Sequence, residues 1–201
     1  PEPGLYSVCY VNAFQTEAEP DGPDGADSWP AEVVWDTEHP MWPGERPIDL
    51  STPQLRDLAA AFVTERLQRC AEAGFDAVEF DNLDTYERYP GAPWDRDDTI
   101  AYATSLVRVA TGLGLAVGQK NTTDLLDAAP EIGFTFAVVE ECGEFDECEA
   151  FAAGYGDHVL AVEYTATGLA AACAALDGAA SVVRRDLDLV EPGEPGYLRA
   201  T

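Results

Sequence analysis

The sequence predicts an α/β protein in which short parallel strands alternate with amphipathic helices. Short apolar runs, many with β-branched residues, recur along the chain as is typical of strands covered on both faces. Segments with helical spacing of apolar residues separate most of these runs. A polar or ionisable residue follows every run. This alternation fits an open doubly wound sheet or a closed barrel.

Six runs are predicted as strands, at residues 5–11, 75–80, 115–118, 134–139, 159–162 and 181–183. A helix is predicted between the first two, because Thr52 is a favourable N-cap, Pro53 suits the first helical position and Gly74 suits the residue after the end. Its predicted apolar stripe consists of Leu55, Leu58, Phe62 and Leu67.

A second helix is predicted to start near Asp97 or Asp98 and to end before Gly112. Shorter helices are predicted at residues 124–129, 147–153 and 169–176. Residues 13–47, rich in Pro, Gly, Asp and Trp, are predicted to form a long loop after the first strand. Long loops of this kind often carry functional residues.

The composition limits the partners of the chain. Its 201 residues are 46% hydrophobic, with 38 acidic and 11 basic residues and a net charge of −27. Such a surface disfavours nucleic acid, which needs basic residues to neutralise phosphates. The sequence contains no run of about 18 apolar residues, so no membrane span is predicted. The acidity indicates adaptation to a high-salt organism, or attraction of a cationic substrate into an acidic cleft. The opening Pro-Glu-Pro-Gly lacks the pattern of a signal peptide.

The five cysteines exclude a complete disulfide framework because their number is odd. Cys142 and Cys148 are close enough in sequence to form a disulfide across a short loop. Cys9, Cys70 and Cys173 lie in apolar segments and are expected to be buried thiols. One disulfide would fit an exported protein.

The residues that end the predicted strands form the candidate site. In a parallel α/β fold the carboxyl ends of all strands lie on one side, so these residues are expected to converge. They include the only lysine of the chain and several carboxylates; the strand-end segments begin at Asn12, Asp81, Gln119, Glu140, Glu163 and Arg184.

Carboxylates dominate this set, which restricts the chemistry. His39 lies in the long loop and His158 at the start of a strand, so neither completes a Ser-His-Asp triad. No Cys/His cluster has zinc-ligand spacing, and Lys120 argues against a magnesium site, so no metal or cofactor is expected. Paired carboxylates are the equipment of glycoside hydrolases. The aromatic residues Trp42, Tyr86, Trp94 and Tyr164 would suit either sugar stacking or ordinary packing.

Residues 74–86, GFDAVEFDNLDTY, resemble the GFDGVEPDNVDGY block of the endo-α-1,4-polygalactosaminidases, glycoside hydrolase family 114. Further blocks are similar in order and spacing: CYVN at 9–12, GQKN at 118–121, FAVVEEC at 136–142, FDEC at 145–148 and VEY at 162–164. The resemblance covers about residues 5 to 185.

This resemblance implies a (β/α)8 TIM-type barrel formed by a single domain over residues 1–201. Six strands are visible, so the first two strands of the barrel are expected to be missing and the domain to be N-terminally incomplete. It also implies hydrolysis of α-1,4-linked galactosamine polymers, which are cationic. Separately, we expect a monomer located outside the cell or at its surface.

The family motifs imply that Asp81 is the nucleophile and Glu140 the general acid/base. A retaining outcome is expected, with carboxyl groups about 5–5.5 Å apart. The implied sugar-binding residues are Tyr10, Asn12, Asn82, Asp84, Tyr86, Lys120, Asn121, Glu163 and Tyr164.

Two departures from the family pattern leave alternatives open. Glu141 replaces a glutamine and Val139 an asparagine, which puts an acid beside Glu140. If both acids faced the cleft, their coupling would raise one pKa, whereas alternation along the strand predicts that they point apart. Because strands are missing, a non-catalytic carbohydrate-binding or surface module on a truncated barrel remains the alternative to an enzyme.

Overall fold

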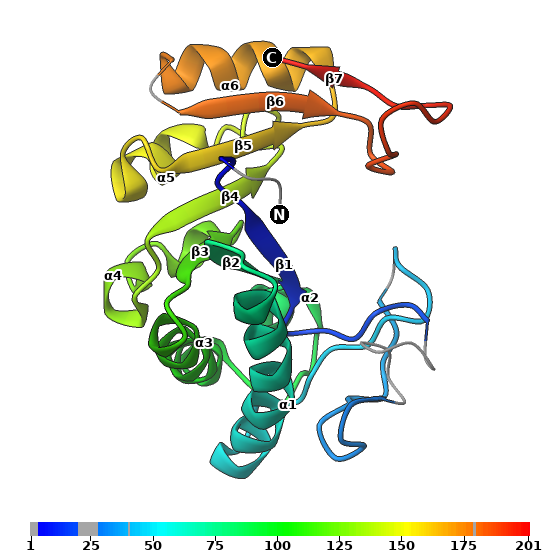
Figure 1. The fold of residues 1–201 in the computed structure, drawn as a ribbon. Coiled ribbons are helices and arrows are strands. Elements are labelled where there is room, and N and C mark those ends of the chain that lie inside the picture. Colours follow the sequence, from blue (N-terminus) through cyan, green and yellow to red (C-terminus); the bar gives the residue numbers. More distant parts are fainter. Residues whose placement is uncertain (1–3, 20–27, 40, 179) are drawn as a thin grey trace. The chain divides into compact units, whose positions relative to one another are not determined.

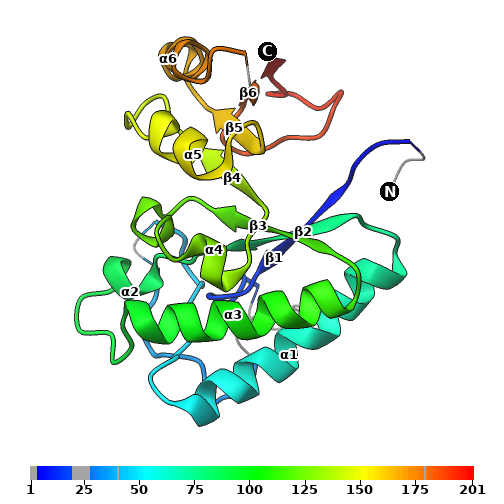
Figure 2. The same ribbon diagram turned by 90° about the vertical axis from the view of Figure 1, so that its left-hand side faces the viewer.

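The computed structural model describes residues 4–19, 28–39, 41–178 and 180–201 (Figures 1 and 2). Residues 20–27 and 40 of the predicted loop therefore lie outside the described residues. The chain divides into two compact units. Unit 1 comprises Pro1–Thr122 and Ala128–Phe134, and unit 2 comprises Thr123–Asp127 and Thr135–Thr201. A single domain over residues 1–201 stays a prediction.

Unit 1 contains three parallel strands that pair in chain order, β1 (Val8–Asn12), β2 (Ala77–Asp81) and β3 (Ala116–Lys120). The long helices α1 (Pro53–Glu72) and α3 (Arg96–Gly112) pack against each other beside these strands (Figure 2). Two one-turn helices complete the unit, α2 (Thr85–Arg88) and α4 (Ala129–Ile132).

Helix α1 begins as the sequence predicts. The Thr52 hydroxyl accepts a hydrogen bond from the Leu55 backbone N–H, and Pro53 is the first helical residue. The predicted stripe is wrong at Leu58, which is 43% exposed. The buried face consists of Ala59, Val63, Arg66, Leu67 and Cys70.

Helix α3 begins at Arg96, slightly before the predicted start. The reason is a capping box, in which Asp95 and Asp98 each accept a hydrogen bond from the backbone N–H of the other. Two orphan N–H groups of the first turn are thereby satisfied, so the helix can start one turn before the apolar stripe becomes continuous.

Unit 2 contains the parallel strands β4 (Phe136–Glu140), β5 (Val159–Glu163) and β6 (Ser181–Arg185). Helices α5 (Cys148–Tyr155) and α6 (Ala166–Leu176) pack against them and against each other (Figure 1). The short strand β7 (Arg199–Ala200), antiparallel to β6, was not predicted because two residues carry no period. The helix predicted at 124–129 is instead the 3-10 turn η2 (Thr123–Leu125), followed by α4.

All six predicted strands are present, and each ends one or two residues later than its apolar run. The parallel ladder continues through the polar residue, as where Asn12 pairs with Asp81 and Glu163 with Arg184. The last residues of the six strands are Asn12, Asp81, Lys120, Glu140, Glu163 and Arg185. These six strand-end residues therefore belong to strands rather than to loops.

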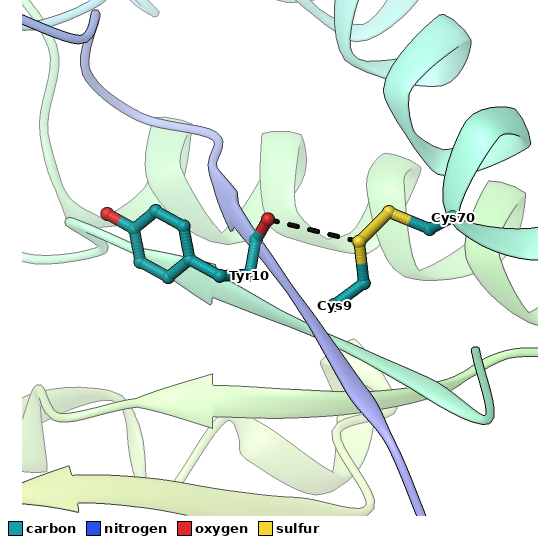
Figure 3. The surroundings of a disulfide bond; sticks show 3 residues. All are labelled: Cys9, Tyr10 and Cys70. Carbon is teal, nitrogen blue, oxygen red and sulfur yellow. Dashed lines mark hydrogen bonds between the residues drawn. A yellow bond between two sulfur atoms is a disulfide. The ribbon is translucent and has the colours of Figure 1, made fainter. Parts of the chain in front are cut away.

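The predicted disulfide between Cys142 and Cys148 is confirmed. The expectation of buried thiols is wrong for the other cysteines, because Cys9 and Cys70 form a second disulfide and Cys173 is exposed. Cys9 on β1 lies beside Cys70 near the end of α1, with their Cα atoms 6.1 Å apart across 61 residues of sequence (Figure 3). Sequence spacing carries no information about this approach.

The long loop folds back on itself, with isolated bridges between Gln15 and Pro47 and between Val34 and Ile48. Its described part contributes fully buried side chains, including Phe14, Val33 and Ile48, so it forms part of the core of unit 1. No helix among the described residues is long and apolar enough to cross a membrane.

Candidate active site

Asp81, at the end of β2, lies between partners from both neighbouring strands. Its Oδ2 accepts a hydrogen bond from the Tyr10 hydroxyl at 3.0 Å and lies 3.4 Å from Lys120 Nζ. Its Oδ1 accepts the backbone N–H of Asn82 at 2.8 Å. The side chain of Lys120 is only 6% exposed, whereas that of Asp81 is 21% exposed. A nearly buried cation thus supports a carboxylate that substrate can still reach.

Tyr10 is held in its protonated form. Burial, and then the charge of Asp81, raise the pKa of its phenol far above the ordinary value of 10.0. The hydroxyl therefore donates to Asp81 throughout the working pH range. Lys120 Nζ also lies 5.9 Å from the centroid of the Tyr10 ring, within reach of a cation–π interaction.

A hydrogen-bond network extends from Asn82, the residue after Asp81. The Asn82 Nδ2 donates to Asn12 Oδ1 at 2.9 Å, and its Oδ1 accepts from an Arg88 nitrogen at 2.7 Å. Arg88 also forms an ion pair with Asp84 and approaches His39 Nε2 at 3.1 Å. Asn12, Asn82 and Asp84, all predicted site residues, are thus joined through Arg88, which sequence reasoning missed.

His39 takes part in this network, although the sequence analysis gave it no role in the site. Its Nδ1 accepts the backbone N–H groups of Met41 and Trp42 at 3.0 and 2.9 Å. Burial, and then the charge of Arg88, lower its pKa below the ordinary 6.5, which favours the neutral ring that these bonds require. The bonds hold the backbone of a turn that carries the half-exposed Trp42.

Glu45, also from the long loop, lies in the electrostatic field of Asp81. Burial raises its pKa most, and the charges of Glu17 and Asp81 add to this, while a hydrogen bond from Gln15 acts in the opposite direction. Tyr89 donates to Gln15 at 2.9 Å and so holds the amide in place. The loop therefore adds acidic groups around Asp81.

Residues with left-handed backbone follow both β2 and β3. Asn82 has φ of 64°, and Asn121 and Thr122 have 47° and 63°. Thr122 is β-branched, for which this region is strained. The fully buried Gln119 stabilises the turn, because its Nε2 donates to the carbonyls of Asn121 and Thr122 at 2.7 and 2.9 Å. Such strain persists where surrounding structure enforces it, often at functional sites.

In unit 2, Glu140 ends β4 and accepts a hydrogen bond from the Tyr164 hydroxyl. Glu141 follows with a left-handed φ of 59°, and its N–H donates to the Val162 carbonyl at 2.8 Å. Burial raises the pKa of Glu141 most, and the charges of Glu140 and Glu144 raise it further. The charge of Glu140 therefore acts on Glu141, but burial has the larger effect on the pKa of Glu141.

Glu163 is placed differently from the expectation that it binds sugar. Its side chain is fully buried, and Oε1 accepts the backbone N–H of Gly143 at 2.7 Å. With no exposed surface it has no face for a saccharide. Its carboxylate and the sulfurs of Cys142 and Cys148 lie within 4.8 Å of one another, but the disulfide consumes both thiolates, so the group does not fit a metal site.

The structure thus brings together six predicted residues in unit 1, Tyr10, Asn12, Asp81, Asn82, Asp84 and Lys120, and joins Glu140 to Tyr164 in unit 2. Tyr86 and Asn121 are half-buried in α2 and after β3. Trp94 is 3% exposed and packs edge-on against Trp35, so it is a core residue and not a stacking surface. The buried Gln119 carried only a weak sequence signal, a polar residue beside a strand end, and Arg88, which is partly exposed at the end of α2, carried none.

Comparisons with known proteins identify a family and similar folds. A model of glycoside-hydrolase family GH114 matches residues 1–200. The structure of Aspergillus fumigatus Ega3 in complex with galactosamine is similar at 25% identity and a TM-score of 0.74, over 90% of this chain and 75% of that one. The glycoside hydrolase domain of PelA from Pseudomonas aeruginosa is similar at 16% identity and a TM-score of 0.66, over 92% and 79%.

A D-allulose 3-epimerase from Methylomonas sp. shares the fold alone, at 15% identity and a TM-score of 0.53, over 72% of this chain and 63% of that one. A sequence comparison with curated proteins finds no significant match. The predicted TIM-barrel fold class is confirmed, with six parallel strands among the described residues and no closed sheet.

Proposed function

The chain belongs to glycoside-hydrolase family GH114, and we propose that it cleaves α-1,4-galactosaminidic bonds in a cationic amino-sugar polysaccharide. Asp81 acts as the nucleophile and Glu140 as the general acid/base. The observation that carries the proposal is the placement of Asp81, a partly exposed strand-end carboxylate supported by Lys120 and Tyr10.

The contacts of Asp81 suit nucleophilic attack. Lys120 stabilises negative charge on Oδ2, and the bonds from Tyr10 and Asn82 fix the plane of the carboxylate. In the first step Asp81 attacks the anomeric carbon, and the bond to the glycosidic oxygen breaks while that oxygen takes a proton from Glu140. A glycosyl ester on Asp81 is formed.

In the second step Glu140 removes a proton from water, which attacks the anomeric carbon and releases Asp81, so the anomeric configuration is retained. Tyr164 donates to Glu140 and thereby orients the group that must exchange this proton. No metal or cofactor enters either step.

The substrate class is supported by charge and by one relative. Free amines make a galactosamine polymer cationic, and a net charge of −27 attracts cations over a distance of about a Debye length. The similar Ega3 structure contains galactosamine. We infer recognition of the same sugar here.

The disulfides support a location outside the cell or at its surface. Both the Cys9–Cys70 and the Cys142–Cys148 bonds require an oxidising compartment to persist. The proposed enzyme is monomeric, and its acidity fits a high-salt organism, where screening removes self-repulsion.

The test is incubation of purified protein with de-N-acetylated polygalactosamine at low and molar salt, with products followed by mass spectrometry. Oligosaccharides are expected, with more at molar salt if the acidity is an adaptation. Asp81→Asn and Glu140→Gln are matched controls of unchanged size, and each is expected to abolish product release while circular dichroism stays unchanged. Full activity of either variant would contradict the assignment. Saccharide binding without turnover would instead favour a binding module.

A further inference from the structure

Glu163 is a fully buried carboxylic acid at the end of β5 that the proposed chemistry does not use. Its Oε1 accepts the Gly143 N–H at 2.7 Å, and its buried Oε2 has no hydrogen-bond partner. Burial raises its pKa most, and Glu141 and Glu144 raise it further, against the bond from Gly143. A buried acid in this setting favours its neutral form.

Two glycines near this carboxyl group, Gly143 and Gly168, have neighbouring atoms so close that neither position has room for a Cβ. A Cβ on Gly168 would lie 2.2 Å from Glu163 Oε2. A Cβ on Gly143 would lie 2.3 Å from the Gly168 carbonyl oxygen and 2.6 Å from the backbone nitrogen of Ala172. The backbone at Gly143 and the first turns of α6 therefore pack closely against each other and around Glu163.

The segment held in this way is the loop that leaves Glu140. It is closed by the Cys142–Cys148 disulfide and starts with the left-handed Glu141, whose N–H continues the ladder to β5. Tyr164, the residue after Glu163, donates its hydroxyl to Glu140 itself. Two consecutive residues therefore act on this region: Glu163 bonds to the loop at Gly143, and Tyr164 bonds to the Glu140 side chain.

We propose that Glu163 is a positioning residue that fixes the 141–148 loop through Gly143 and so orients Glu140. The proposal rests on the proposed role of Glu140 as general acid/base. It replaces the expectation that Glu163 binds sugar, because the acceptor oxygen points to a backbone amide and the second oxygen to α6. Orientation errors near 1 Å typically lower catalytic rates by about 100-fold.

The test compares Glu163→Gln with Glu163→Ala. The glutamine keeps the acceptor for Gly143 and the volume, so kcat is expected within about threefold of wild type; the alanine loses both, and kcat is expected to fall about 30-fold with KM nearly unchanged. Hydrogen exchange of the loop amides, Gly143 above all, is expected to quicken about tenfold in the alanine variant alone. A sugar-binding role predicts instead that KM rises in both variants.

The exchange measurement separates failure of this proposal from failure of the proposed function, because it needs no substrate. Unchanged loop exchange in Glu163→Ala overturns the proposal. Faster loop exchange with unchanged kcat in the folded protein also overturns it, because the loop would then not orient Glu140.

A second variant tests the geometry independently. Gly168→Ala is expected to lower Tm in the wild-type background and much less in the Glu163→Ala background, where the clash with the carboxyl group is removed. Equal losses in both backgrounds contradict the close contact between Gly168 and Glu163.

Discussion

The two units hold their strand-end carboxylates by different means. In unit 1, Asp81 is supported by the charge of Lys120, by a hydrogen bond from the Tyr10 hydroxyl on β1 and by the backbone N–H of Asn82. In unit 2, Glu140 accepts a phenol hydroxyl from Tyr164 and is followed by a loop that is closed by a disulfide and held by a buried acid.

This difference matches the different demands of the two roles proposed for Asp81 and Glu140. A nucleophile must be ionised and must keep one orientation, and a buried cation beside it serves both needs. A general acid/base must alternate between two protonation states, so an uncharged partner and a rigid backbone are better suited to it. The comparison predicts that substitutions in the two units have different effects on activity and on stability.

The largest difference in activity is expected between Asp81→Ala and Glu140→Ala. The substrate is an aryl α-galactosaminide whose leaving group needs no protonation. With it, Glu140→Ala is expected to keep the wild-type rate of the first step, whereas the rate of Asp81→Ala is expected to fall about 10⁴-fold or more. Added azide is expected to give the α-glycosyl azide, with retained configuration, in Glu140→Ala and the β-glycosyl azide, with inverted configuration, in Asp81→Ala. Burst kinetics and product analysis by NMR check both points, and identical behaviour of the two variants would contradict the assigned roles.

The two disulfides are expected to differ in their contribution to stability. Cys9–Cys70 closes a loop across 61 residues and Cys142–Cys148 one across 6, so chain entropy predicts about 4 and about 2 kcal/mol respectively. Denaturant unfolding of the paired Cys→Ala variants measures this, in a Cys173→Ser background that prevents disulfide exchange with the exposed thiol. A greater loss from the shorter loop would show that the disulfide in unit 2 acts on the native state.

Loss of the cation beside Asp81 is expected to have an intermediate effect. Lys120→Met keeps the aliphatic stem but removes the charge 3.4 Å from Oδ2, so kcat is expected to fall about 100-fold. Lys120→Arg is the control, because it restores charge with a different shape. Steady-state kinetics with thermal unfolding separates the effects, since a purely structural lysine would lower Tm and leave kcat of the folded protein unchanged.

The smallest effects concern the pH dependence of stability. The folded-state pKa values of Glu163 and Glu45 lie above the ordinary 4.5, so the folded state binds their protons more tightly than the unfolded state. Stability is therefore expected to fall as pH rises above about 4.5 and to stay lowered beyond the raised values.

Glu163→Gln and Glu45→Gln cannot ionise and are expected to lose less stability over this range. Burial is the largest cause of both raised pKa values, and hydrogen bonds from Gln15 to Glu45 and from Gly143 to Glu163 act against it, so flattening is expected in both variants. Urea unfolding between pH 4 and pH 8 measures both, and curves parallel to wild type would show that neither acid is perturbed.

Local chemistry within a short window decided much of this fold. Thr52 and Pro53 start α1 because the N-cap bond and the fixed φ of proline need only adjacent residues. The β-branched runs mark all six parallel strands, and the polar residue that ends each run identifies the candidate site. The short Cys142–Cys148 pairing was also predictable, since few residues separate the thiols.

The tertiary structure alone decided the contacts between residues far apart in sequence. Cys9 contacts Cys70, His39 contacts Arg88 and Asn82 contacts Asn12 because β1, α1, the long loop and α2 pack in one unit. The burial of Glu163 depends on two glycines that allow backbone to approach its carboxyl group. Composition and periodicity describe what each segment buries, whereas these contacts depend on how the buried faces pack together, which no local pattern encodes.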